Sequence, residues 1–336
     1  FGSHPDIAKD DGPEHLHLTV MPYQLWLREI IQHNVIVHRS WDQRTAAIFY
    51  VTGWGTLDIN NLNGQVNISN EEIVANMEAN AKFGVPQIAP HQPQDIEVML
   101  VAGGPSINDF ADEIQERREA GMPLITVNGA YLWAIEKGLS PSMQMVIDGR
   151  EFNKRFVEQF DGLTDTTKFV IASQCNPALL ESLPKDRSFI WQVSYGPDLD
   201  ADVTRIYGKK YDDWWPIPGG STVTLRALCA IQMLGFMKIH VYGLDSCVTD
   251  EHHGYSQPEA DPQMKALTWV TVGEGTEFER RFQCNTWHLM QAYDFQNMCN
   301  RVLKDCQLAV YGDGLIAHWL RAAASLPSAE IVEKPQ

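Results

Sequence analysis

From residue 96 onward, short apolar runs alternate with longer segments in which apolar residues recur every three or four positions. Short runs of this kind are typical of buried strands, and the longer spacing is typical of amphipathic helices. The pattern predicts strands at 96–102, 123–130, 141–148, 167–174, 188–194, 238–245 and 307–314, with helices at 106–121, 130–138, 221–236 and 286–306. Strands that alternate with helices predict an α/β fold, in which helices cover both faces of a parallel sheet.

The first 92 residues follow a different pattern. A helical spacing is visible at 25–31, a strand-like run at 46–54, and a second helix at 70–83, with Asn70 as its expected N-cap and Gly84 just past its end. A connector rich in proline and glutamine follows at 85–95. We therefore expect an N-terminal region at 1–92, a tail plus a small α+β lobe. A main domain at 93–325 and a C-terminal tail at 326–336 follow it.

Composition narrows the class of protein. The 336 residues are 44% hydrophobic and 21% charged, which is typical of a globular chain. No apolar run approaches the roughly 18 residues of a membrane span, and no signal peptide is visible at the N-terminus, so we expect a cytoplasmic protein without a membrane partner. The net charge of −17 counts against nucleic acid as a partner without excluding a local basic groove.

The six cysteines are scattered, and none of them forms a CxxC pair. Free thiols are the simplest interpretation, with disulfides or a metal site as the alternatives.

Polar and glycine residues follow the predicted strands at the point where each strand ends. Ligands of an open parallel sheet bind beyond the carboxyl ends of its strands. The residues at these ends are Gly103, Gly104, Pro105 and Ser106; Asn128 and Gly129; Asp148; Ser173, Gln174, Cys175 and Asn176; and Gly243, Leu244 and Asp245. A sheet edge that only closed a core would not need polar residues at every strand, so this edge is the predicted ligand site.

Two of the predicted helices begin with glycine and serine. The first begins in "VMLVAGGPSINDF", after Gly103 and Gly104, and the second begins in "WWPIPGGSTVTLRAL", at Gly219, Gly220, Ser221 and Thr222. Glycines let a backbone approach a ligand closely, and helix N-termini offer free N–H groups to an anion. Neither loop has the lysine of a Walker loop or the three-glycine dinucleotide spacing. Ser106 is also an expected helix cap, and a plain tight turn stays an alternative for the first loop.

Carboxylates and histidines stand near two strand ends. Asp245 ends one strand, and His252 and His253 follow it in the run "DSCVTDEHHGYSQPE". Histidine moves protons near neutral pH, so either histidine is a candidate general base, with Asp245 orienting the loop. Asp148 ends another strand and is a candidate for a metal bound to phosphate, for a ribose hydroxyl, or for a simple turn cap. No strong zinc pattern is present.

Several motifs in order carry a resemblance to a known superfamily. The runs "VAGGPSIND", "ITVNGA", "GLSPSMQMVIDG" and "GGSTVTLRALCAIQMLGFMKIHVYGLD" resemble the 6-hydroxymethylpterin diphosphokinase-like superfamily. This superfamily includes motility accessory factors and phage-type members, and it is related to single-domain, Rossmann-like bacterial sialyltransferases. The resemblance covers residues 95–315 and implies a Rossmann-like catalytic domain.

The resemblance also implies roles for single residues. Gly104, Ser106 and Asn128 would bind the donor nucleotide, while Gly220, Ser221 and Thr222 would hold its base, ribose or phosphate. Gly103, Asp148, Ser173 and Gln174 are further candidates for cofactor binding because of their place at the strand ends. In the sialyltransferases a histidine after the strand that ends in glycine, a hydrophobic residue and aspartate acts as the base, and here it would be His252 or His253.

These features favour a glycosyltransferase that uses a nucleotide-sugar donor. The alternative is a diphosphokinase that transfers pyrophosphate from ATP, with Mg²⁺ held by Asp148 and Asp245. A non-catalytic nucleotide-binding or structural protein is the third reading. The acceptor stays open among a small molecule, a glycan, a protein and a hydroxymethylated DNA base, the last if the protein is phage-encoded, and a homo-oligomer also stays open.

Overall fold

The structure, a computed structural model, describes residues 36–43, 46–52, 68–194, 196–248, 254, 267–273 and 277–325. The chain divides into two compact units, 1–66 and 67–336. The described backbone of the first unit is an antiparallel pair of strands, β1 (Ile36–Gln43) and β2 (Ala46–Thr52). Segment 67–92, which the sequence pattern groups with the N-terminal region, lies in the larger unit.

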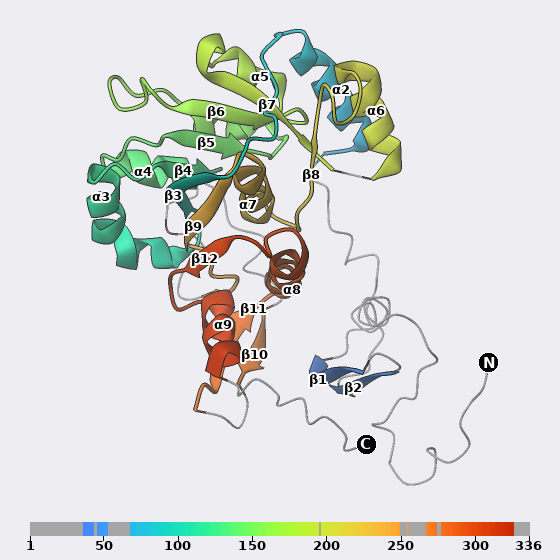
Figure 1. Cartoon of the computed structure of the whole chain (residues 1–336), viewed down its shortest axis with the longest axis vertical. Coiled ribbons are helices and arrows are strands. Elements are labelled where there is room, and N and C mark those ends of the chain that lie inside the picture. Colours follow the sequence, from blue (N-terminus) through green and yellow to red (C-terminus); the bar gives the residue numbers. More distant parts are fainter. Residues whose placement is uncertain are drawn as a thin grey trace, which may run out of the picture. The chain divides into compact units, whose positions relative to one another are not determined.

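The larger unit contains an eight-stranded parallel sheet in the order β12-β9-β3-β4-β5-β6-β7-β8 (Figure 1). The strands are β3 (Gln94–Val101), β4 (Leu124–Val127), β5 (Met143–Val146), β6 (Lys168–Ala172), β7 (Ser188–Val193), β8 (Pro216–Ile217), β9 (Phe236–Tyr242) and β12 (Gln307–Val310). The predicted α/β class with a parallel sheet is confirmed.

Helices cover this sheet on both faces. They are α2 (Asn70–Ala81), α3 (Ala111–Glu119), α4 (Ala130–Glu136), α5 (Pro177–Glu181), α6 (Pro197–Tyr207), α7 (Val223–Met233), α8 (Thr286–Arg301) and α9 (Leu315–Ser325). Short 3₁₀ helices are η2 (Pro105–Phe110), η3 (Glu151–Val157) and η4 (Lys185–Arg187). Directly before α8 in the sequence, β10 (Thr268–Val272) and β11 (Arg280–Cys284) form an antiparallel hairpin.

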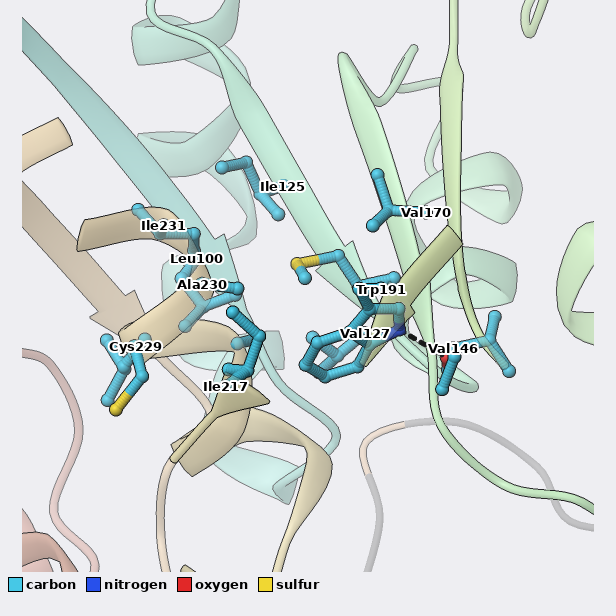
Figure 2. Packing of buried hydrophobic residues seen from close by; sticks show 14 of the residues in the cluster. Leu100, Ile125, Val127, Val146, Val170, Trp191, Ile217, Cys229, Ala230 and Ile231 are labelled. Atoms are coloured by element: carbon cyan, nitrogen blue, oxygen red, sulfur yellow. Dashed lines mark hydrogen bonds between the residues drawn. The ribbon is translucent and has the colours of Figure 1, made fainter. Parts of the chain in front are cut away.

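Alternate residues of β3 belong to two different hydrophobic clusters. Leu100 packs in the cluster that contains Leu228 of α7, while Met99 packs in the cluster that contains Ile114 of α3 and Trp133 of α4. Figure 2 shows Leu100 beside Ala230 and Ile231 of α7. Successive side chains of a strand point to opposite faces, so β3 is buried on both sides, as its unbroken apolar run predicts.

Two helix starts differ from the sequence prediction. The N-cap of α2 is Ser69, not Asn70: its hydroxyl accepts from the backbone N–H of Glu72 (3.2 Å), whose carboxylate accepts from the backbone N–H of Ser69 (2.8 Å). This capping box satisfies two free N–H groups at once. The segment predicted as one helix at 106–121 is a 3₁₀ helix followed by α3. Ser106 lies inside the 3₁₀ helix, and no side chain caps its start at Gly104.

All six cysteines are free, as predicted. Among the described residues, no helix is long and apolar enough to cross a membrane.

Candidate functional site

The sheet has a topological switch point at β3. From β3 the chain adds strands on one side, β4 through β8, and then crosses over to place β9 on the other side of β3. The loops that leave neighbouring strands at such a point diverge and leave room for a ligand at the carboxyl edge. The glycine-serine loop 103–106 therefore lies at the carboxyl end of a central parallel strand, as the sequence predicts.

The loops after β3 and β9 are joined by one carboxylate. The backbone N–H of Ser106 donates to Oδ2 of Asp245 (2.9 Å), and the Ser106 hydroxyl donates to Oδ1 (2.6 Å). Asp245 is only 4% exposed. Burial raises the pKa of Asp245 above its ordinary value, and the two bonds from Ser106 oppose this shift. Asp245 thus ties the two loops of the switch point together.

Glycines make this close packing possible. A Cβ atom on Gly104 would lie 2.4 Å from Oδ2 of Asp245, and one on Gly314 would lie 2.5 Å from the Asp245 Cα. A Cβ on Gly312, whose φ is +115°, would lie 2.8 Å from the Ser106 Oγ, so a third loop also packs closely here. The strand ends of β3, β9 and β12 therefore meet around one buried carboxyl group, with no space for a side chain between them.

The second glycine-serine segment has the same arrangement. The backbone N–H of Ser221 donates to Oδ2 of Asp294 on α8 (2.9 Å), and a Cβ on Gly220 would lie 2.6 Å from the Asp294 Cβ. Thr222 is the N-cap of α7, and its hydroxyl accepts from the N–H of Leu225 (3.4 Å). At both glycine-serine segments, a carboxylate of the chain itself occupies the serine N–H that an anionic ligand would use.

Asn128 follows β4 in a left-handed conformation, with a φ of +41°. Its side-chain oxygen accepts from the N–H of Ile147 (3.4 Å), and its backbone oxygen accepts from Nε2 of Gln144 (3.0 Å). Gln144 is fully buried and also donates to the backbone oxygen of Phe156 (2.9 Å). Gln144 therefore fixes the ends of β4 and β5 relative to each other.

Asp148 is held by a neighbouring cation. Its Oδ2 forms an ion pair with the Arg150 guanidinium (2.5 Å), and its Oδ1 accepts from Nε (3.0 Å) and the backbone N–H (3.1 Å) of Arg150. Beyond β6, the fully buried hydroxyl of Ser173 donates to Oε1 of Gln192 (2.6 Å). Gln174 donates from Nε2 to the backbone oxygen of Ile147 (2.6 Å). In this structure these three side chains make contacts within the protein.

His252 and His253 lie outside the described residues, but Gly254, the next residue in the chain, is described. Its N–H donates to the backbone oxygen of Gly103 (3.0 Å), and its oxygen accepts from Nδ2 of Asn108 (3.2 Å). The segment after β9 thus returns to the first glycine-serine loop at residue 254.

The structure brings Gly103, Gly104, Ser106 and Asp245 together at the switch point. That Asn128, Ser221 and Thr222 lie within reach of one ligand at Ser106 stays a prediction. Trp214, just before the second glycine-serine segment, is fully buried in a hydrophobic cluster with Ile73 and Met77.

Three residues at this edge were missed in the sequence. Gly312 and Gly314 lie at the end of the strand predicted at 307–314, so the search for polar and glycine residues at strand ends would have found them there. Asp294 lies in the middle of a predicted helix, where no sequence signal distinguishes it from a solvent-exposed acid.

A family model described as 6-hydroxymethylpterin diphosphokinase MptE-like matches residues 71–251, just over half of the 336 residues. The chain belongs to the MptE-like family. The matched range runs from α2 to the loop after β9, so it includes Ser106 and Asp245. Because the family is named for a diphosphokinase, membership supports a transferase. A comparison with curated proteins gives no match.

Two solved structures resemble this member of the MptE-like family. The first is a Maf glycosyltransferase from Magnetospirillum magneticum AMB-1, with a TM-score of 0.51 and 14% identity over 89% of this chain. The match covers 49% of that protein, so the chain spans about half of its length. The second is a mammalian sialyltransferase, with a TM-score of 0.36 and 9% identity, covering 78% of this chain and 88% of the other. The first likeness supports the fold described above.

Proposed function

We propose that the protein is a glycosyltransferase that binds a nucleotide-sugar donor at the carboxyl edge of β3 and β9. The observation that carries this proposal is the switch point itself, where three glycine-bearing loops meet around Ser106 and Asp245. Such crevices bind nucleotides in open α/β sheets. The Maf glycosyltransferase, which shares the fold, adds support for a sugar donor.

Sugar transfer needs a base for the acceptor. As the base removes the hydroxyl proton, the acceptor oxygen bonds to the sugar carbon and the nucleotide leaves with the electrons of the broken bond. We assign the base to His252 or His253, because Gly254 lies against the backbone of Gly103. Asp245 lies at the start of this loop, shortly after β9, and anchors the loop to Ser106.

Neither carboxylate proposed for Mg²⁺ is arranged as a metal ligand. Both oxygens of Asp148 accept from Arg150, and both oxygens of Asp245 accept from Ser106. Among the residues that the structure describes, no group of three or more histidine, cysteine, aspartate or glutamate side chains is placed to hold a metal ion. Asp148 and Asp245 therefore do not fit a Mg²⁺ site.

The MptE-like family name favours a second candidate, pyrophosphate transfer from ATP to a hydroxymethyl group. A thermal-shift series with CMP, CDP, UDP, GDP and ATP, each with and without Mg²⁺, tests both candidates. A nucleotide at a hundred times its Kd adds about 2.7 kcal/mol of stability. That stabilisation corresponds to a rise of roughly 5 to 10 °C in Tm for a unit of this size. A response to ATP that requires Mg²⁺ favours the diphosphokinase. No response to any nucleotide favours the non-catalytic reading.

The base is tested with His252→Ala and His253→Ala. Loss of a general base lowers kcat by about 10²- to 10⁴-fold. Donor affinity should stay within about twofold of wild type, because we assign the donor contacts to the strand-end loops. Full turnover in both variants would contradict the assignment, and loss of donor affinity would make the histidine a donor contact.

The acceptor is proposed to be a small molecule, a glycan or a protein ahead of modified DNA, because the net charge of −17 repels a phosphate backbone.

A further inference from the structure

A basic and aromatic cluster on η3 is not used by the proposed chemistry. η3 follows β5, so it lies at the carboxyl edge of the sheet, two strands away from β3. It is held there by Gln144, which donates to the backbone oxygen of Phe156 (2.9 Å), and by the Tyr131 hydroxyl, which donates to the backbone oxygen of Glu158 (2.6 Å). Neighbouring strands lie about 4.8 Å apart, so β5, which η3 follows, lies roughly 10 Å from β3.

The centre of the cluster is Phe152, whose side chain is 40% exposed. The guanidinium carbon of Arg150 lies 4.5 Å from the centre of the phenyl ring, and that of Arg155 lies 5.4 Å from it. Arg155 also lies over Phe156 (5.1 Å). Cations over aromatic faces are attracted to them, so the rings hold both guanidinium groups in place.

Positive charge is less well neutralised on η3 than on the basic segment at Lys209 and Lys210. Arg150 is paired with Asp148, but among the described residues no carboxylate forms an ion pair with Lys154 or Arg155. By contrast, Lys209 pairs with Asp212, and Lys210 with Asp200. In a chain of net charge −17, Lys154 and Arg155 are thus two neighbouring cations without an ion-pair partner among the described residues.

The segment also contains buried polar atoms without partners. Asn153 is 1% exposed, and neither its amide oxygen nor its amide nitrogen has a hydrogen-bond partner. The Nε of Arg155 is likewise buried and unpaired. An unpaired buried polar atom is unfavourable, and native proteins leave few of them unexplained. A bound group with anionic oxygens would accept from Nδ2 of Asn153 and Nε of Arg155 and offset part of this cost.

We propose that η3 binds an oxyanion, a phosphate or a carboxylate, of the acceptor substrate. The planar guanidinium of Arg155 suits two oxygens of such a group, and Lys154 adds a point charge. The assignment to the acceptor rests on the proposed function, because the donor nucleotide is placed at β3 and β9. The anion site itself rests on the geometry of η3.

The test is a titration with inorganic phosphate and, separately, acetate at constant ionic strength, followed by thermal shift and by isothermal calorimetry on the full chain. The wild-type protein should bind one of the two anions saturably. Binding of phosphate would identify the site as a phosphate site, and binding of acetate would identify it as a carboxylate site. Arg155→Gln should weaken that binding at least fivefold, and Arg155→Lys should restore part of it. Arg281→Gln is the matched control, because Arg281 also lies over an aromatic ring, Trp269 (5.1 Å).

Three outcomes would overturn the proposal: no saturable binding of either anion by wild type, equal binding by Arg155→Gln and wild type, or an equal loss in the Arg281→Gln control. Nucleotide binding separates this inference from the proposed function. If Arg155→Gln weakens nucleotide and phosphate in parallel, the anion is the donor's phosphate and the acceptor assignment is wrong. If phosphate binds through Arg155 but no nucleotide binds, the anion site is supported and the proposed glycosyltransferase function is contradicted.

Discussion

Ser106→Ala should destabilise the protein in a pH-dependent way. The substitution removes the hydroxyl that donates to Oδ1 of Asp245 (2.6 Å) and keeps the backbone N–H that donates to Oδ2. Asp245 is 4% exposed, so water does not readily replace the lost donor. Hydrogen bonds to charged groups contribute about 1.5–3 kcal/mol, so we expect the free energy of unfolding at pH 7 to fall by about 2–3 kcal/mol.

The pH dependence follows from the pKa of Asp245. Burial raises this pKa above its ordinary value of 3.8, and the Ser106 hydroxyl lowers it, so the variant should raise it further. A raised folded-state pKa means that the native state binds the proton more tightly than the unfolded state does. The free energy of unfolding should therefore decrease as the pH rises from about the pKa of Asp245 in the unfolded state through its pKa in the folded state. This decrease should be larger in Ser106→Ala.

Urea unfolding at pH 7 and pH 4, followed by tryptophan fluorescence, measures both effects. The matched control is Ser173→Ala, which removes a buried hydroxyl that also donates over 2.6 Å but to Gln192, a side chain that does not titrate. The control should lose stability equally at both pH values, whereas the cost of Ser106→Ala should shrink at pH 4. A cost below about 0.5 kcal/mol at pH 7, or the same pH profile for both variants, would refute the reasoning.

Three further predictions concern the same edge of the sheet. Gly314→Ala should cost more than about 2 kcal/mol in urea unfolding, because its Cβ would lie 2.5 Å from the Asp245 Cα and only a backbone shift relieves the clash; unchanged stability would contradict the close packing. Asp294→Asn should tighten nucleotide binding about threefold or more by calorimetry, because the charge competing for the Ser221 N–H is removed; weaker binding would make Asp294 a positioning residue instead. Gln144→Leu should lower stability by about 2–4 kcal/mol in urea unfolding, because two backbone oxygens lose their donor inside the core; a smaller loss would show that water reaches them.

The local spacing of apolar residues was enough to predict a parallel sheet with helices on both faces. The run at 96–102 is apolar at every position that β3 buries on its two faces, and such a short run is typical of a strand covered on both sides. Alternation of such runs with helical spacing then predicts parallel strands, and parallel strands place their carboxyl ends on one edge. The location of the Gly103–Ser106 loop follows from the sequence for this reason.

Tertiary structure decided which strand ends meet. Ser106 and Asp245 are 139 residues apart, and Ser221 and Asp294 are 73 apart, so no local spacing relates them. The sequence placed glycine and serine where helix N–H groups would bind an anion, but only the packing of β9 against β3, and of α8 beside α7, brings a carboxylate of the chain to those groups. The periodicity of apolar residues shows how each helix or strand is buried. The neighbours of each element depend instead on the order of strands in the sheet, which is set by packing of the whole chain.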